Sequence, residues 1–200
     1  LAMDAIRMER EVLGHTCGVQ DQLHAAFGGW NRFDFHGERI QQRPILAPQE
    51  TLERLTSSMY LVFTGQTRSA PPAIAAQLEG TRSGTITDEL EAAYELVGRG
   101  QAIIEAGGGD AVERFGRLLH EGWMLKRQFS TAVSNEAIDG LYAHGLANGA
   151  YGGKLCGAGS GGFLLFVVDP ARREQFLQAF EPDSYVKVAC DWSGTHVTAT

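Results

Sequence analysis

A glycine-rich segment is the part of this chain whose residue types and spacing are most able to do chemistry. It reads Gly152-Gly153-Lys154-Leu155-Cys156-Gly157-Ala158-Gly159-Ser160-Gly161-Gly162, and six of these eleven residues are glycine. Such a backbone can adopt positive φ and approach a ligand closely. The run 163–168 that follows is apolar, β-branched and aromatic, which predicts a buried strand. We therefore predict a glycine loop that leads into a strand.

Two well-known phosphate-binding motifs do not fit this segment. Gly157, Gly159 and Gly162 match G-x-G-x-x-G, but the dinucleotide fingerprint must follow a strand and begin a helix. A P-loop fails on residue types, because Asn148 stands where its first glycine belongs and Leu155 where its Ser or Thr belongs. Two interpretations stay open: a ligand-binding loop, and a glycine-rich turn between two packed elements.

Two carboxylates near the start of the chain are further candidates. Asp21 lies in Cys17-Gly18-Val19-Gln20-Asp21-Gln22, a glycine-flanked stretch in which a carboxylate serves either as a catalytic base or as a turn or cap residue. Glu9, in Glu9-Arg10-Glu11, is open to a similar pair of interpretations: a functional carboxylate, or a solvated helix residue.

The elements that must position these residues follow from periodicity and from breaks at glycine and proline. We predict a helix ending near Gly14, a loop with a short helical turn over 17–29, a hairpin of 32–35 and 38–44, a helix at 48–55, a strand at 58–64, helices at about 70–79, 85–106, 110–130 and 134–147, a strand at 163–168, a helix at 170–180, and strands near 185–190 and 195–199. Helices gathered between groups of strands predict an α+β fold.

Composition excludes several functional classes. The 200 residues are 44% hydrophobic and 20% charged, as in an ordinary globular protein. A net charge of −7 argues against a nucleic-acid-binding face, and no apolar run reaches the length of a membrane span. Three cysteines without metal spacing favour a reducing compartment, and no signal peptide is visible. We expect a cytoplasmic protein.

The first residues already carry a helical stripe. Leu1, Ala5, Met8 and Val12 share one helix face, yet no capping residue precedes them and Leu1 is not an initiator methionine. A helix entered in mid-pattern predicts that the sequence is the C-terminal part of a longer protein.

Taken together, these segments resemble the GHMP kinase superfamily, and most of all the bacterial D-glycero-D-manno-heptose 7-phosphate 1-kinases. Residues 17–22 look like the Cys-Gly-x-x-Asp-Gln segment of galactokinases. The likeness runs in the same order along nearly the whole chain, and it is carried by Glu9, 18–22, 25–31, 63–68, 119–123, Lys126-Arg127, Ser134-Asn135 and the glycine loop.

The resemblance implies a GHMP kinase fold in two parts. Residues 1–66 would be the remainder of the N-terminal domain, and 67–200 a helix-rich, ferredoxin-like C-terminal domain. Family members carry an upstream Pro-x-x-x-Gly-Leu-Gly-Ser-Ser-Ser-type phosphate loop and a magnesium-ligating serine, which these 200 residues lack. We therefore expect the 200 residues alone to be inactive and to bind ATP poorly.

Site roles also follow from the resemblance. Asp21 would deprotonate the accepting sugar hydroxyl and Glu9 would hold Mg²⁺. Gly157, Gly159, Gly161 and Gly162 would contact the substrate and phosphate region through backbone N–H groups. Lys154 would add positive charge there, with a surface lysine as the alternative. Arg68 would bind a sugar phosphate, with an exposed arginine near a helix start as the alternative.

The function implied is that of an ATP-dependent sugar kinase. It would phosphorylate the anomeric hydroxyl of a sugar phosphate, with heptose 7-phosphate as the leading substrate and heptose 1,7-bisphosphate as product. The expected partner is therefore a small-molecule sugar, not nucleic acid or membrane. The alternatives are a kinase for another sugar, such as galactose or fucose, and a non-catalytic ligand-binding protein built on the same fold.

Overall fold

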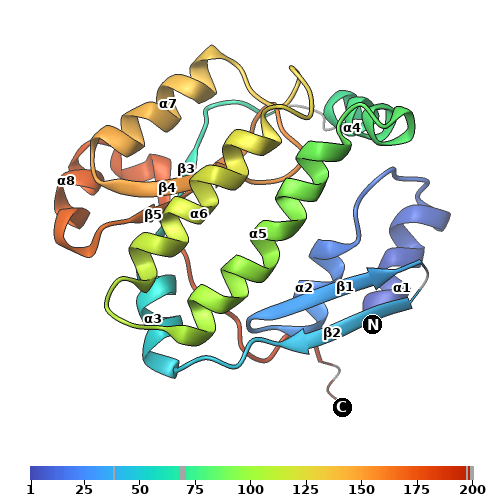
Figure 1. Cartoon of the computed structure of the whole chain (residues 1–200), viewed down its shortest axis with the longest axis horizontal. Helices are drawn as coiled ribbons and strands as arrows, with labels where there is room; N and C mark the ends of the chain where they lie inside the picture. The colour runs from blue at the N-terminus through green and yellow to red at the C-terminus, as the bar shows by residue number, and fades with distance from the viewer. Residues whose placement is uncertain (38, 68–70, 197, 199–200) are drawn as a thin grey trace. The chain divides into compact units, whose positions relative to one another are not determined.

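The computed structural model describes residues 1–37, 39–67, 71–196 and 198, with the backbone alone at 71–73 (Figure 1). The chain forms two compact units, one of Leu1–Leu46 with Ala189–Thr200 and the other of Ala47–Val188. Residues 47–66 thus group with the second unit and the last twelve residues with the first. The expected family boundary after residue 66 follows a different division and stays a prediction.

The first unit holds two short helices and a hairpin. Its elements are α1 (Ala2–Arg7), a π-helical turn η1 (Met8–Val12), α2 (Gln20–Phe27), β1 (Asn31–His36) and β2 (Arg39–Pro44). The strands pair antiparallel from Asn31↔Pro44 to His36↔Arg39, so the predicted hairpin is confirmed. The ring of Phe33 packs against His24 and Phe27 at centroid distances of 4.8 and 5.6 Å, which attaches α2 to the hairpin.

The segment 189–196 belongs to this first unit and forms hydrogen bonds with the end of α2 and the residues after it. Gly29 N donates to Asp191 O at 2.7 Å, and Thr195 N donates to Ala25 O at 2.9 Å. The backbones of Gly28 and Gly194 approach so closely that a Cβ on Gly28 would lie 2.3 Å from Gly194 N. The strand predicted near 195–199 is wrong at 195, 196 and 198, because this segment caps a helix instead of pairing with a sheet, and its other residues lie outside the described ones.

The second unit is a four-stranded sheet covered by helices. Its elements are α3 (Gln49–Ser57), β3 (Met59–Phe63), α4 (Pro71–Ser83), α5 (Thr87–Ala106), α6 (Ala111–Lys126), α7 (Glu136–Ala147), β4 (Ala150–Leu155), β5 (Phe163–Val168), η2 (Pro170–Arg172), α8 (Arg173–Gln178), η3 (Pro182–Ser184) and β6 (Tyr185–Lys187). The strands pair antiparallel in the order β4-β5-β3-β6. The sheet's first and third strands in chain order, β3 and β5, lie at its centre, as in the ferredoxin-like arrangement.

Strand β4 corrects one sequence expectation, since the glycine loop was expected to begin at residue 152. Gly152 and Gly153 instead lie in the strand, and the loop is confined to 156–162. A Cβ on Gly152 would stand 2.0 Å from Gly116 O of α6, and one on Gly153 would stand 2.1 Å from Leu165 O. Gly152 therefore lets the backbone of α6 lie directly on the sheet, and Gly153 admits the close approach of β5.

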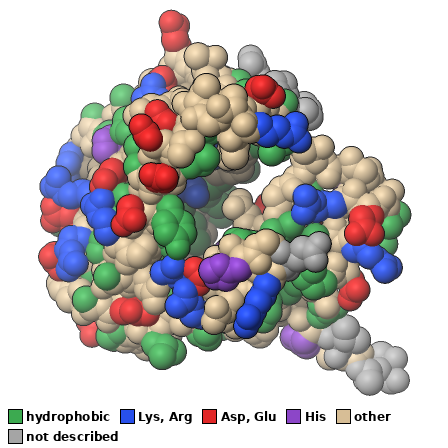
Figure 2. All heavy atoms as spheres, turned by 45° about the vertical axis from the view of Figure 1, so that its right-hand side comes forward, with side chains coloured by type: hydrophobic (Ala, Val, Ile, Leu, Met, Phe, Trp, Pro, Cys, Tyr) green, Lys and Arg blue, Asp and Glu red, His purple; other side chains and the backbone are tan. Residues whose placement is uncertain are grey.

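The core of the second unit lies between the sheet and its helices. Phe166 of β5 is fully buried, and a Cβ on Gly145 of α7 would stand 2.4 Å from its ring. Trp123 of α6 is also buried, as expected for a core residue. On the face drawn in Figure 2, acidic and basic side chains are interspersed. An ion pair of 2.7 Å between Arg99 and Glu121 joins α5 to α6.

Candidate active site

The glycine loop 156–162 connects two neighbouring strands of the sheet, β4 and β5. Ser160 has a φ of +67° and is the one non-glycine residue with positive φ in the described ranges. Gly159 has a φ of +131°, and a Cβ there would stand 2.9 Å from Val133 Cα. Both residues adopt backbone conformations that side-chain-bearing residues rarely take. The loop therefore has a shape that its glycines make possible.

The loop is fixed on two sides. Thr64, just after β3, donates from Oγ1 to Gly162 O at 2.9 Å, and Gly162 N donates to Gln66 O at the same distance. On the other side, Ser160 N donates to Val133 O at 3.0 Å and Ser160 Oγ donates to Ala132 O. A ligand would meet a backbone already held in place, which lowers the entropy that binding must cost.

The held loop leaves several backbone donors available. No described residue accepts a hydrogen bond from the N–H groups of Gly157, Ala158, Gly159 or Gly161. Successive free N–H groups in a loop of this kind form a concavity suited to an anion. Of the four glycines predicted to bind through their N–H groups, Gly157, Gly159 and Gly161 thus have theirs available, whereas the N–H of Gly162 donates to Gln66 O.

Two lysines lie beside these donors. Lys126, at the end of α6, donates from Nζ to Gly157 O at 2.5 Å. Burial, and then the charge of Lys154, lower the pKa of Lys126 to about 8, while Cys156 acts in the opposite direction. Lys154 itself is exposed on β4. The predicted residue Lys154 is therefore accompanied by a second cation.

Sequence reasoning did not assign Lys126 a role, although the residue lies within the segment that carries the family resemblance. A lysine at the end of a helix is ordinarily a solvated cation that complements the helix dipole. Its contact with the loop depends on α6 lying against β4 through Gly116 and Gly152, and only the tertiary packing reveals that.

In the first unit, Glu9 and Asp21 are both within electrostatic reach of one thiol, that of Cys17. Cys17 Sγ donates to Glu9 Oε2 at 3.4 Å. Desolvation, and then this hydrogen bond and the charge of Glu9, raise the pKa of Cys17; the charge of Asp21 adds to the effect and Arg10 opposes it. Both predicted carboxylates thus act on the same half-buried thiol, which brings them into one neighbourhood.

Local structure positions each carboxylate. Glu9 lies in the π-helical turn, which ends at Val12 with Leu13 N bonded to Met8 O at 2.9 Å, and Gly14 follows with a φ of +68°. π-Helical turns of this kind are often found at functional sites. Asp21 is exposed in the first turn of α2, an eight-residue helix where the loop with a short helical turn was predicted.

The side chain beside Asp21 has an open hydrogen-bonding position. The buried Oε1 of Gln22 meets no donor among the residues that the structure describes. Buried acceptors are nearly always paired in native proteins, so an unpaired one invites a donor from a ligand. Asp21 likewise accepts no hydrogen bond from a described residue, which leaves its carboxylate free to act on a hydroxyl.

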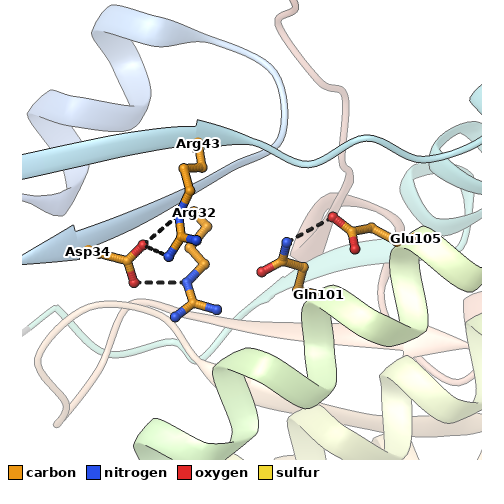
Figure 3. Close-up of polar contacts among 5 residues, drawn as sticks. All are labelled: Arg32, Asp34, Arg43, Gln101 and Glu105. Atoms are coloured by element: carbon orange, nitrogen blue, oxygen red, sulfur yellow. Dashed lines mark hydrogen bonds and ion pairs between the residues drawn. The ribbon is translucent and has the colours of Figure 1, made fainter.

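A buried carboxylate on the hairpin was not anticipated (Figure 3). Asp34 accepts from Nε of Arg32 and from Nε of Arg43, both at 2.9 Å, and Arg43 adds a second bond through Nη2. The hydrogen bond from Arg43 and then that from Arg32 hold the pKa of Asp34 below its usual range, against the effect of burial. Figure 3 also shows the separate Gln101–Glu105 hydrogen bond of 2.8 Å within α5. The Asp34 cluster locks the two strands together.

Some predicted site residues are not joined by the structure. The loop and Lys154 belong to the second unit, whereas Glu9 and Asp21 belong to the first. Their meeting in a single site stays a prediction. Arg68 lies outside the described residues. No trio of His, Cys, Asp or Glu that could hold a metal occurs within the described ranges, and no helix there is long and apolar enough for a membrane span.

Comparison with known proteins gives this geometry a context. The family model for the C-terminal domain of GHMP kinases matches residues 103–187. The D-glycero-alpha-D-manno-heptose 7-phosphate kinase of Campylobacter jejuni is 32% identical over 190 residues, covering 92% of this chain and 53% of that protein. The bifunctional fucokinase/GDP-fucose pyrophosphorylase of Arabidopsis thaliana is 28% identical over 174 residues, covering 84% and 16%.

A solved structure agrees with these relatives. The crystal structure of a D-glycero-D-manno-heptose 1-phosphate kinase from Bacteroides thetaiotaomicron superposes with a TM-score of 0.62 at 26% identity, covering 99% of this chain and 55% of that one. The chain therefore spans about half the length of the two heptose kinases that it matches. Residues 103–187 match the model of the GHMP kinase C-terminal family, in agreement with the resemblance seen in the sequence.

Proposed function

We propose that the protein containing this chain is an ATP-dependent sugar kinase that phosphorylates the anomeric hydroxyl of heptose 7-phosphate, giving heptose 1,7-bisphosphate. The observation that carries the proposal is the held glycine loop, with its four available N–H groups and two lysines, in a chain 32% identical to a heptose 7-phosphate kinase. The reaction and substrate class point to a cytoplasmic enzyme.

The chemistry matches what phosphoryl transfer requires. The transferring group is already electrophilic, so the protein mainly positions the reactants and offsets negative charge. Backbone N–H groups of the loop would donate to phosphoryl oxygens, and Lys154 would supply a positive charge beside them. Because the loop is fixed by Thr64 and Ser160, these donors need no rearrangement when charge develops.

Asp21 would act on the acceptor. Its exposed carboxylate would accept a hydrogen bond from the anomeric hydroxyl and take its proton during attack on the γ-phosphoryl group. General-base assistance of this kind is worth about 10²- to 10⁴-fold in rate.

Mg²⁺ fits the donor set. The described part of the chain offers Glu9 as a carboxylate ligand but no cluster of three ligating side chains, and Mg²⁺ commonly takes one or two carboxylates and fills its octahedron with water and phosphate oxygens. Bound there, the ion would neutralise charge on the nucleotide phosphates. Glu9 would be held in place by the Cys17 thiol that donates to its Oε2.

The fucokinase relative supports a second candidate substrate, an unphosphorylated sugar such as fucose. The decisive assay supplies the protein expressed from its whole gene with Mg-ATP and either heptose 7-phosphate, heptose, fucose or galactose. We expect the highest kcat/KM for heptose 7-phosphate. A preference for a free sugar would reject that substrate and retain the kinase, whereas no turnover with any of them would reject both.

Arg68 provides the finer test of the same substrate. If its guanidinium binds the distal phosphate, Arg68→Ala should raise KM for the phosphorylated sugar about ten- to a hundredfold and leave KM for ATP unchanged. Arg82→Ala, on an exposed arginine of α4, serves as the control. For the 200 residues alone we propose no kinase activity.

A further inference from the structure

The charged form of Lys126 is disfavoured at its place in the fold, and packing alone does not explain why a lysine is found there. Its side chain is half-buried, its Nζ donates to the carbonyl of Gly157, and Lys154 is a second cation within electrostatic reach. Partial desolvation beside a like charge disfavours the ammonium form. A methionine would fill the same space without that cost. The charge of Lys126 is explained if it acts on the loop.

The bond to Gly157 determines where the next amide points. The carbonyl of Gly157 and the N–H of Ala158 belong to one planar trans peptide group, so the two point in opposite directions. By holding the carbonyl, Lys126 fixes the direction of the Ala158 N–H. That N–H has no acceptor in the described part of the chain, and the same holds for its neighbours at Gly157 and Gly159.

We propose that Lys126 is a positioning residue that aims the Ala158 N–H into an anion site completed by Lys154, and that the anion is a phosphoryl group. The inference rests on the proposed function for the identity of that group, and its chemistry requires a compact oxyanion. Lys126 acts through the peptide that it holds and through its charge, while Lys154, exposed on β4, is free to follow the anion.

The charge of Lys126 couples anion binding to proton uptake. Burial and the charge of Lys154 lower the pKa of Lys126 to about 8, with Cys156 of the loop opposing them. Arg127, next to Lys126 in the sequence, is paired with Asp139 of α7 at 2.5 Å. A bound anion restores the charged form, so the free protein must take up a proton when it binds above pH 8. Affinity should then decline as the pH rises through 8.

The test uses inorganic sulfate, whose charge stays constant over this range, titrated into ¹⁵N-labelled protein expressed from its whole gene. At pH 7, Lys126→Met should raise the Kd for sulfate about tenfold or more and shift the Ala158 amide signal. Lys154→Met, the matched control, should raise the Kd while leaving the Ala158 signal of the free protein in place.

Lys126→Arg tests the titration of Lys126 separately from its hydrogen bond to Gly157. Arginine keeps its charge throughout and can still donate to Gly157 O, so this variant should bind sulfate at pH 7 and lose the decline, about tenfold in the wild type, between pH 7 and 9.5. An unchanged Ala158 signal in Lys126→Met, or equal sulfate affinity in that variant and the wild type, would overturn the inference. Sulfate binding that depends on Lys126 in a protein that phosphorylates no sugar would leave the inference standing and reject the proposed function.

Discussion

The two regions that carry predicted site residues are built in different ways. In the glycine loop of the second unit the proposed functional groups are backbone amides, and their directions are set by close approaches such as that of Gly159 to Val133. In the first unit the proposed functional groups are the side chains of Glu9 and Asp21, which lie on a π-helical turn and on a short helix. Binding by backbone amides is lost when the shape of the loop changes. The function of a carboxylate is lost when its chemical group changes.

The difference predicts opposite responses to conservative substitution. In the carboxylate region of the first unit, a change of one atom type at constant shape should abolish function. In the glycine loop of the second unit, a change of one methyl group at constant chemistry should do the same. Four variants test this contrast, in order of decreasing effect.

Asp21→Asn should produce the largest effect. The substitution keeps the side chain's shape and removes both its charge and its capacity to accept a proton, so kcat should decline about 10²- to 10⁴-fold. ATP affinity, measured by calorimetry, should stay near the wild-type value. Asp183→Asn, on an exposed carboxylate of the second unit, is the control. Unchanged turnover in Asp21→Asn would remove Asp21 from the mechanism.

Gly159→Ala should come next. The added Cβ would stand 2.9 Å from Val133 Cα at a φ of +131°, so the loop must shift. Backbone strain of this kind costs about 1–3 kcal/mol, which predicts a roughly five- to 150-fold loss of anion affinity. Gly140→Ala, in α7 with open space around its Cα, should bind as the wild type does. A Gly159→Ala protein with normal affinity would show that the loop's shape is not what binds.

The glycine loop and the strands beside it show what could be predicted from the sequence. Glycine spacing and the apolar run 163–168 located the loop and β5, and the periodicity of α4–α7 located the helices, because both signals are local. Strand β4 escaped prediction because Gly152 and Gly153 have little preference for strands. Their conformation is set by Gly116 O and Leu165 O, which are distant in sequence. Lys126 and the segment 189–196 were missed for the same reason.

Lys126→Met should change stability with a definite sign. The folded pKa of Lys126 is about 8, below its ordinary value of 10.5, so between these values the unfolded chain holds a proton that the folded chain has released. Stability from this group therefore rises as the pH increases from about 8 to 10.5, by about 1–3 kcal/mol in denaturant unfolding. The methionine variant should lack this rise, and Lys187→Met, on an exposed lysine, should retain it. Identical pH profiles in Lys126→Met and wild type would contradict the lowered pKa.

Thr195→Val should have the smallest effect, and it tests how α2, the helix that carries Asp21, is held in place. Thr195 donates to Ala25 O from its N at 2.9 Å and from its Oγ1 at 3.0 Å, so valine removes one of two bonds to the end of the helix that carries Asp21. One such bond contributes about 0.5–1.5 kcal/mol. We expect kcat to decrease a few-fold with KM for ATP unchanged, because Asp21 is less well oriented while the loop is untouched. Thr81→Val removes a comparable bond to Gln77 O, far from Asp21 in the chain, and should leave kcat intact. If both variants lose stability equally and neither loses turnover, the segment 189–196 stabilises the unit without positioning its carboxylate.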